Sequence, residues 1–161
     1  MNLHIEPQRI GVIPFDTRNN DIAVLFVTSQ TRGRWILPKG KPSPEENHID
    51  TCKREAFQEA GVSGKVIEDF PITAVITKQT VDGIKEIPVT YYPMLVSEQV
   101  PDWPEKNKRQ RHWALLRDAP NVAYKEDLLH VTQQFENLAP WVIRIAALYK
   151  DRQQVEQMQA R

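Results

Sequence analysis

Within the stretch from Gly40 to Val62, Glu55 and Glu59 lie four positions apart in a segment whose apolar spacing predicts a helix. At 3.6 residues per turn these side chains are neighbours, and their like charges destabilise a helix by roughly 0.2–0.5 kcal/mol. A hard divalent cation, Mg²⁺ or Mn²⁺, would offset that repulsion because it prefers carboxylate and carbonyl oxygen ligands. The two glutamates therefore predict a metal site.

The helical spacing also divides the segment into two faces. We expect a face packed against a sheet, consisting of Ile49, Cys52, Ala56, Phe57 and Ala60. The opposite face then carries Arg54, Glu55, Gln58 and Glu59. The alternative interpretation is a solvated acidic face whose helix starts with a capping box of Ser43 and Glu46 behind Pro44. Gly61 closes the helix in either case.

The same stretch resembles the Nudix box, G-x5-E-x7-R-E-U-x-E-E-x-G-U with U aliphatic. Its fixed positions correspond to Gly40, Glu46, Arg54, Glu55, Glu59 and Gly61, and Gln58 stands at the first paired glutamate. The resemblance implies a Nudix-type fold and metal-dependent hydrolysis of a phosphoanhydride. It implies metal ligation by Glu55, Gln58, Glu59 and the backbone carbonyl of Lys39, with Glu46 as a further candidate.

Gln58 departs from the box, since an amide oxygen ligates Mg²⁺ without bringing negative charge. We therefore expect fewer metal ions or weaker binding. Glu59 is expected to be a metal ligand, Glu55 a ligand or the base, and Arg54 the partner that orients a carboxylate by a bidentate pair. A further acidic group would come from Glu46 or from a later loop with Glu98, Asp102 or Glu105. The alternative is a domain that has lost catalysis and kept binding.

A basic cluster follows downstream, with Lys106, Lys108, Arg109 and Arg111 within a short stretch. An exposed turn is the alternative interpretation, but on a strand Arg109 and Arg111 share one face, which suits a polyphosphate. This region is similar to the diphosphoinositol polyphosphate and diadenosine polyphosphate phosphohydrolases of the Nudix family. That resemblance implies a basic substrate-binding mouth made of Arg34, Lys39, Lys41, Arg109 and Arg111. The competing substrates are ordinary nucleotides and RNA 5′ ends.

The elements that position these residues follow from the remaining pattern. Residues 9–15 and 21–29 read as an antiparallel pair around the turn 16–20. Further β-rich runs are expected at 34–38, 63–80, 84–98 and 109–116, with a turn at 81–83. The chain becomes helical from Ala119, and a C-terminal helix over about 140–158 starts at Pro140, with Trp141, Ile145 and Leu148 covering the sheet. This order predicts an α+β domain, an α/β/α sandwich of a mixed β-sheet flanked by helices.

Size and charge limit the function further. The chain has 161 residues with 21 basic and 21 acidic side chains, so we expect one domain over residues 1–161 and no nucleic-acid partner. Its apolar runs are too short to span a membrane. The single cysteine, Cys52, is expected to be a core residue in a reducing cytoplasm. We expect a monomer or homodimer acting on a small phosphorylated substrate.

Overall fold

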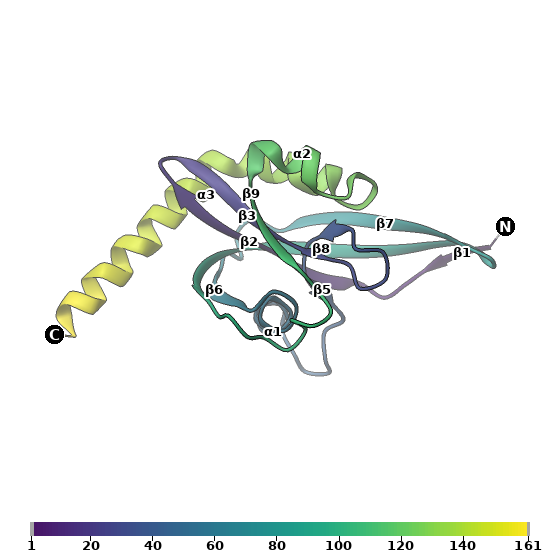
Figure 1. Cartoon of the computed structure of the whole chain (residues 1–161), viewed down its shortest axis with the longest axis horizontal. Helices are drawn as coiled ribbons and strands as arrows, with labels where there is room; N and C mark the ends of the chain where they lie inside the picture. The colour runs from purple at the N-terminus through teal and green to yellow at the C-terminus, as the bar shows by residue number, and fades with distance from the viewer. Residues whose placement is uncertain (1, 161) are drawn as a thin grey trace.

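The computed structural model describes residues 2–160, which form one mixed sheet with helices on both faces. Helix α1 (His48–Ala60) covers one face, and α2 (Ala119–Val122) with α3 (Lys125–Gln159) covers the other, as Figure 1 shows. A 3-10 turn at Leu116–Asp118 precedes α2. The predicted α+β class with its layered α/β/α arrangement is confirmed.

The sheet is built around its longest strand, β8 (Gly83–Gln99). The central order is β1-β8-β2-β3-β4, with β1 (Asn2–Ile5), β2 (Arg9–Arg18), β3 (Asp21–Thr28) and β4 (Trp35–Ile36). The others are β5 (Lys39–Gly40) beside β2, β6 (Val62–Val66) and β7 (Ile72–Thr80) beside β8, and β9 (Arg111–Leu115) beside β3. β8 runs parallel to β1 and β2, and the remaining pairs are antiparallel.

The predicted antiparallel pair at the start of the chain is confirmed as β2 and β3, with Phe15 opposite Val24. Its turn places Asn19 and Asn20 at φ 51° and 67°, in the left-handed region that asparagine tolerates. The β-rich run over 63–80 is two strands rather than one. It breaks before β7 at Pro71, which has no N–H to continue a ladder, and β6 and β7 pair with different ends of β8.

Helix α1 starts later than the capping box predicted. Its N-cap is Asn47, whose side chain accepts a hydrogen bond from the Asp50 N–H. Glu45 has φ 68°, so the backbone turns away from a helix between Ser43 and Asn47. The Ser43 N–H does donate to Glu46 Oε1 at 3.0 Å, but this contact closes a turn ahead of the helix. Gly61 ends the helix at φ 66°, as predicted.

The prediction that the last helix starts at Pro140 was wrong. α3 is continuous from Lys125 and contains Pro140, which removes one intrahelical hydrogen bond, and the helix changes direction along its length (Figure 1). Trp141 and Leu148 were expected to cover the sheet but are 57% and 58% exposed. Val142 and Ala146 are buried in their place, because they continue at helical spacing the buried stripe that begins with Leu128, Val131 and Phe135.

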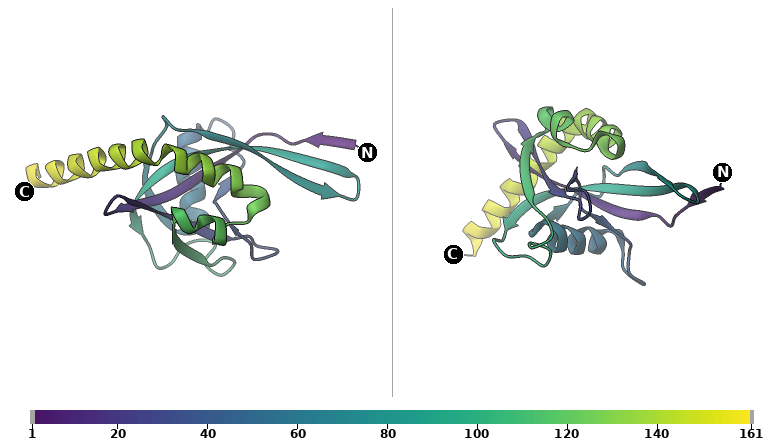
Figure 2. Two further views of the ribbon diagram at one scale, coloured as in Figure 1. Left: turned by 90° about the horizontal axis from the view of Figure 1, so that it is seen from above. Right: turned by 45° about the vertical axis from the view of Figure 1, so that its right-hand side comes forward.

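The core lies between the sheet and its helices. Phe15 meets Phe135 of α3 edge to face, and Cys52 of α1 is buried on the other side of the sheet, as expected for a core thiol. Figure 2 shows that the far ends of β7, β8 and β1 project from one end of the body and the end of α3 projects from the other. No helix within residues 2–160 is both long and apolar enough to cross a membrane.

Candidate active site

Helix α1 presents Glu55 and Glu59 to the short strand β5 rather than to open solvent. Their exposed fractions are only 7% and 5%. Phe57, which the helical pattern placed on the buried face, is instead 43% exposed. The buried arc of α1 is therefore rotated toward the glutamates, because the loop around Gly40 covers that side of the helix.

Glu55 packs directly beneath Gly40. A Cβ atom built on Gly40 would lie 2.2 Å from Glu55 Oε1, so a residue with a side chain cannot occupy this position without moving the carboxylate. Glu55 Oε1 also accepts a hydrogen bond from Arg54 Nη1 at 2.5 Å. Burial raises the pKa of Glu55, and the adjacent Arg54 opposes that shift.

Glu59 is held by groups from two other parts of the chain. The backbone N–H of Lys39 donates to Glu59 Oε2 at 2.7 Å, and Arg109 Nη2 lies 2.6 Å from Glu59 Oε1. Burial raises the pKa of Glu59 to about 7, against the lowering effect of Arg109. Half-buried Lys39, on β5, thus orients the second carboxylate through its backbone.

Arg54 forms the bidentate pair that the sequence predicted. Its Nε and Nη2 atoms donate to the two oxygens of Glu46 at 2.9 and 2.8 Å, and Nη2 also donates to the carbonyl of Lys41 at 2.9 Å. Hydrogen bonds from Arg54, Ser43 and Thr51 lower the pKa of Glu46 to about 2. Glu46 is therefore the anchor of Arg54, which links it to Glu55.

Among the three acidic residues proposed from the later loop, Glu105 alone joins this cluster. It is buried, and its Oε1 accepts hydrogen bonds from Arg109 Nε at 3.0 Å and Gln30 Nε2 at 2.7 Å. Glu98 is exposed on β8, and Asp102 is exposed and paired with Lys106. Burial raises the pKa of Glu105, but its hydrogen bonds, above all the one from Arg109, bring the pKa below its ordinary value.

The two arginines expected at a substrate mouth have partners inside the protein. Besides its carboxylates, Arg109 donates to the carbonyl of Thr28 at 2.8 Å. Arg111 donates to the carbonyls of Ala60 and Val100 at 2.9 and 2.8 Å and stacks 4.0 Å over the ring of Trp103. Both guanidinium groups hold the loop before β9 against α1. We therefore assign them a positioning role in place of substrate contact.

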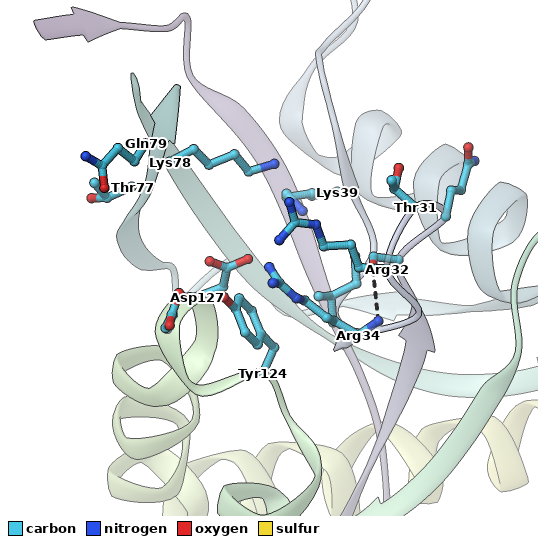
Figure 3. Close-up of a pocket in the computed structure, with 13 residues that line it drawn as sticks. Thr31, Arg32, Arg34, Lys39, Thr77, Lys78, Gln79, Tyr124 and Asp127 are labelled. Atoms are coloured by element: carbon cyan, nitrogen blue, oxygen red, sulfur yellow. Dashed lines mark hydrogen bonds between the residues drawn. The ribbon is translucent and has the colours of Figure 1, made fainter. Parts of the chain in front are cut away.

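A cavity of about 520 Å³ lies on the α3 side of the sheet, next to Lys39. Its charged lining comprises Arg32, Arg34, Lys39, Lys78, Glu126 and Asp127. Figure 3 shows the lysine and arginine side chains converging on one space, with Asp127 facing them from the start of α3. Arg34 also stacks 4.1 Å over the ring of Tyr124. Lys41, the remaining predicted mouth residue, is exposed and does not line this cavity.

Sequence reasoning missed five of the charged residues around this cavity. Four of them line it, namely Arg32, Lys78, Glu126 and Asp127. The pKa of Lys39 is lowered mainly by burial, and the nearby charge of Arg9 lowers it further. Arg9 Nε is buried and has no hydrogen-bond partner among the described residues. The one available signal was strand alternation, which places Arg9 and Gly11 on one face of β2 beside Lys39 of β5.

The residues beside Gly40 fit a small divalent cation. Glu55 and Glu59 bring buried carboxylates on successive turns of α1, and the β5 backbone passes beside both. Mg²⁺ is commonly held by one or two carboxylates together with water and substrate phosphate oxygens. Within residues 2–160 there is no set of three or more His, Cys, Asp or Glu side chains poised as metal ligands. The site thus requires oxygens from elsewhere to complete the coordination.

Comparisons with known proteins show which proteins this chain resembles. The NUDIX domain family model matches residues 6–135. The chain is 27% identical to Nudix hydrolase 12, mitochondrial, of Arabidopsis thaliana over 72% of its length, and spans 59% of that relative. It is 31% identical to diphosphoinositol polyphosphate phosphohydrolase 3-beta of Bos taurus, covering 71% of this chain and 68% of the relative. A C. elegans Ap4A hydrolase structure matches with a TM-score of 0.62 at 20% identity, over 81% of this chain and 96% of that one.

Proposed function

This chain belongs to the Nudix family, and on that basis we propose that it is a metal-dependent hydrolase of phosphoanhydrides. The observation that carries the proposal is the double use of Lys39. Its backbone N–H fixes Glu59 beside Glu55, while its side chain enters a cavity lined by basic groups. Neither Glu55 nor Glu59 lines that cavity, so a diphosphate bound there would have to extend past Lys39 to reach the two carboxylates.

We assign the metal ion, Mg²⁺ or Mn²⁺, to Glu55 and Glu59, with the carbonyl of Lys39 as a further ligand. When bound, it would neutralise phosphate charge and lower the pKa of a water ligand. Arg54 keeps Glu55 in place, and Gly40 leaves room for its carboxylate. Burial favours the protonated form of Glu59, and a nearby cation would favour its ionised form, so Glu59 would release its proton on binding the metal.

For the substrate we propose a dinucleoside polyphosphate or an inositol pyrophosphate. The cavity volume of about 520 Å³ lies within the usual range for small-molecule sites, roughly 300–1,000 Å³. Arg32, Arg34 and Lys78 supply charge for phosphate oxygens. Glu126 and Asp127, on the same cavity, repel a ligand phosphorylated on every side. This favours a dinucleoside polyphosphate, whose nucleoside ends carry hydrogen-bond donors.

Two alternatives keep the same metal site. An ordinary nucleotide or an RNA 5′ end would also place a diphosphate beside Glu59. A catalytically weakened nucleotide-binding domain is the alternative from another class, and Gln58 is the residue that favours it.

For the location of the protein we propose a reducing compartment, the cytoplasm, which suits the buried free thiol of Cys52. The oligomeric state we propose is a monomer or homodimer.

A substrate panel with Mg²⁺ or Mn²⁺ tests the proposal. It contains a dinucleoside polyphosphate, an inositol pyrophosphate, a nucleoside triphosphate and a triphosphorylated RNA end, and product formation is followed by ion-exchange chromatography. We expect the highest kcat/KM for the dinucleoside polyphosphate. Preference for the triphosphate would overturn the substrate assignment. Ligand-dependent thermal stabilisation without product from any compound would overturn the hydrolase assignment.

A further inference from the structure

Arg109 lies among the carboxylates of the active site as a buried cation. Its guanidinium lies 2.6 Å from Glu59 Oε1 and 3.0 Å from Glu105 Oε1, and its side chain is 9% exposed. It also donates to the carbonyl of Thr28 on β3 at 2.8 Å. A cation this close to a metal ligand contributes to the charge balance of the site.

Arg109 does not depend on Glu59 to keep this position. Two of its three partners, Glu105 and Thr28, lie outside the metal-binding helix. Glu105 is itself held by Gln30, and its backbone N–H donates to the carbonyl of Gln58 at 3.1 Å. The guanidinium is therefore anchored at the site whether or not a metal ion binds to Glu59.

The ion pairs of the site form two groups of the same composition. In one, Arg54 lies between Glu46 and Glu55, and in the other Arg109 lies between Glu59 and Glu105. One guanidinium between two carboxylates leaves one negative charge in each group when all the groups are ionised. The two groups together carry a charge of minus two, which one divalent cation balances.

Gln58 acts in the same direction. The Gln58 backbone carbonyl accepts a hydrogen bond from the backbone N–H of Glu105, so a glutamate at position 58 would add a negative charge near Glu105, whereas the amide adds none. Neutral Gln58 and the buried guanidinium of Arg109 each make the site less negative, so fewer metal cations are needed to balance its charge. Both residues adjoin Glu105, because Arg109 pairs with its carboxylate and the Gln58 backbone carbonyl accepts from its backbone N–H.

We propose that Arg109 is a fixed counter-cation that takes the place of an additional metal ion, so that this site binds one divalent ion per chain. The inference rests on the proposed function, since it assigns the metal to Glu55 and Glu59. Arg109 is then a positioning residue that sets metal stoichiometry through Glu59 and the loop before β9.

Titration of the metal-free chain with MnCl₂, with free Mn²⁺ counted by electron paramagnetic resonance, tests this directly. We expect one tightly bound Mn²⁺ per chain. The double variant Gln58→Glu, Arg109→Gln makes the site more negative by two charges and is expected to bind a second Mn²⁺. Arg109→Lys, which keeps the positive charge, is the matched control and is expected to bind one.

Two Mn²⁺ ions bound with comparable affinity by the unmodified chain would overturn the inference, and this result does not depend on whether any variant folds. A double variant that is folded by circular dichroism and still binds one Mn²⁺ would overturn it as well. Absence of any Mn²⁺ binding to the unmodified chain would instead remove the proposed function on which the inference rests.

Discussion

Among single residues, the site depends on the absence of a side chain at Gly40 and on the buried charges of Glu59 and Arg109. The glycine at position 40 and the charged positions around Glu55 could be predicted from the sequence, because the box fixes their spacing. The partners of Arg109 could not, since Thr28 lies 81 residues away in the chain and meets Arg109 only when β3 and the later loop come together. Strand alternation predicted that Arg109 and Arg111 bind phosphate, but in the fold both side chains bond to other groups of the protein.

Gly40→Ala should disrupt the metal site with little effect on the rest of the fold. The added Cβ would lie 2.2 Å from Glu55 Oε1 and would displace the carboxylate. We expect Mn²⁺ affinity, measured by calorimetry, to fall by at least about tenfold, equivalent to roughly 1.4 kcal/mol. Gly33→Ala is the control for backbone strain, because its φ of 60° disfavours a side chain although the added Cβ would meet nothing within 4 Å. An equal loss of affinity in both variants would contradict this account.

The stability of the metal-free chain should fall as the pH rises toward neutrality. The folded-state pKa of Glu59 is raised to about 7, above its ordinary value of 4.5, so the protonated form is the one that stabilises the fold. That contribution is complete below pH 4.5 and is lost as the pH rises through about 7. We expect a loss on the order of 2–3 kcal/mol relative to Glu59→Gln, measured by urea unfolding. Parallel pH profiles for the two proteins would exclude a raised pKa at Glu59.

At the scale of elements, the end of α1 is fixed by the loop that follows β8. Trp103 Nε1 donates to the carbonyl of Glu59 at 3.0 Å, and Arg111 donates to the carbonyl of Ala60 at 2.9 Å. These bonds satisfy carbonyls that a helix C-terminus leaves without intrahelical partners. The apolar spacing of the sequence was enough to predict α1. The side chains that bond to its last carbonyls could not be predicted, because they approach the helix only in the folded structure. The same limit explains the error at Pro140, where packing of α3 overrides a local start signal.

Arg111→Met should weaken this junction. The variant keeps the length of the side chain but leaves the carbonyls of Ala60 and Val100 without their donor and removes the contact with Trp103. We expect the free energy of unfolding in urea to fall by roughly 2–3 kcal/mol. Lys108→Ala, at an exposed position of the same loop, should change it by less than about 0.5 kcal/mol. Similar values for both variants would show that the junction contributes little.

In the molecule as a whole, one residue at the edge of the sheet contacts features on both of its faces. Lys39, on β5 at the edge of β2, connects the carboxylates of α1 on one face with the cavity beneath α3 on the other. The last turns of α3 project away from both (Figure 1). Residues 151–159 are exposed throughout, so they contribute little to the packing that holds the site.

A chain that ends at Lys150 should therefore keep its stability and its metal site. Lys150 itself is retained because it pairs with Asp16 at 2.9 Å. We expect the free energy of unfolding to change by less than about 1 kcal/mol and the Mn²⁺ affinity to stay the same. A larger loss of stability would mean that the projecting turns are covered in solution by a contact outside this chain.

Above all, we propose that Glu55 and Glu59 together bind a divalent ion beside a diphosphate. Anomalous scattering from crystals grown with Mn²⁺ and a nonhydrolysable dinucleoside polyphosphate would show whether they do. The predicted result is an anomalous peak within coordination distance, about 2.0–2.3 Å, of oxygens from both glutamates, with phosphate density on the side of Lys39. The contradicting result is ordered ligand in the cavity with no anomalous peak at either carboxylate.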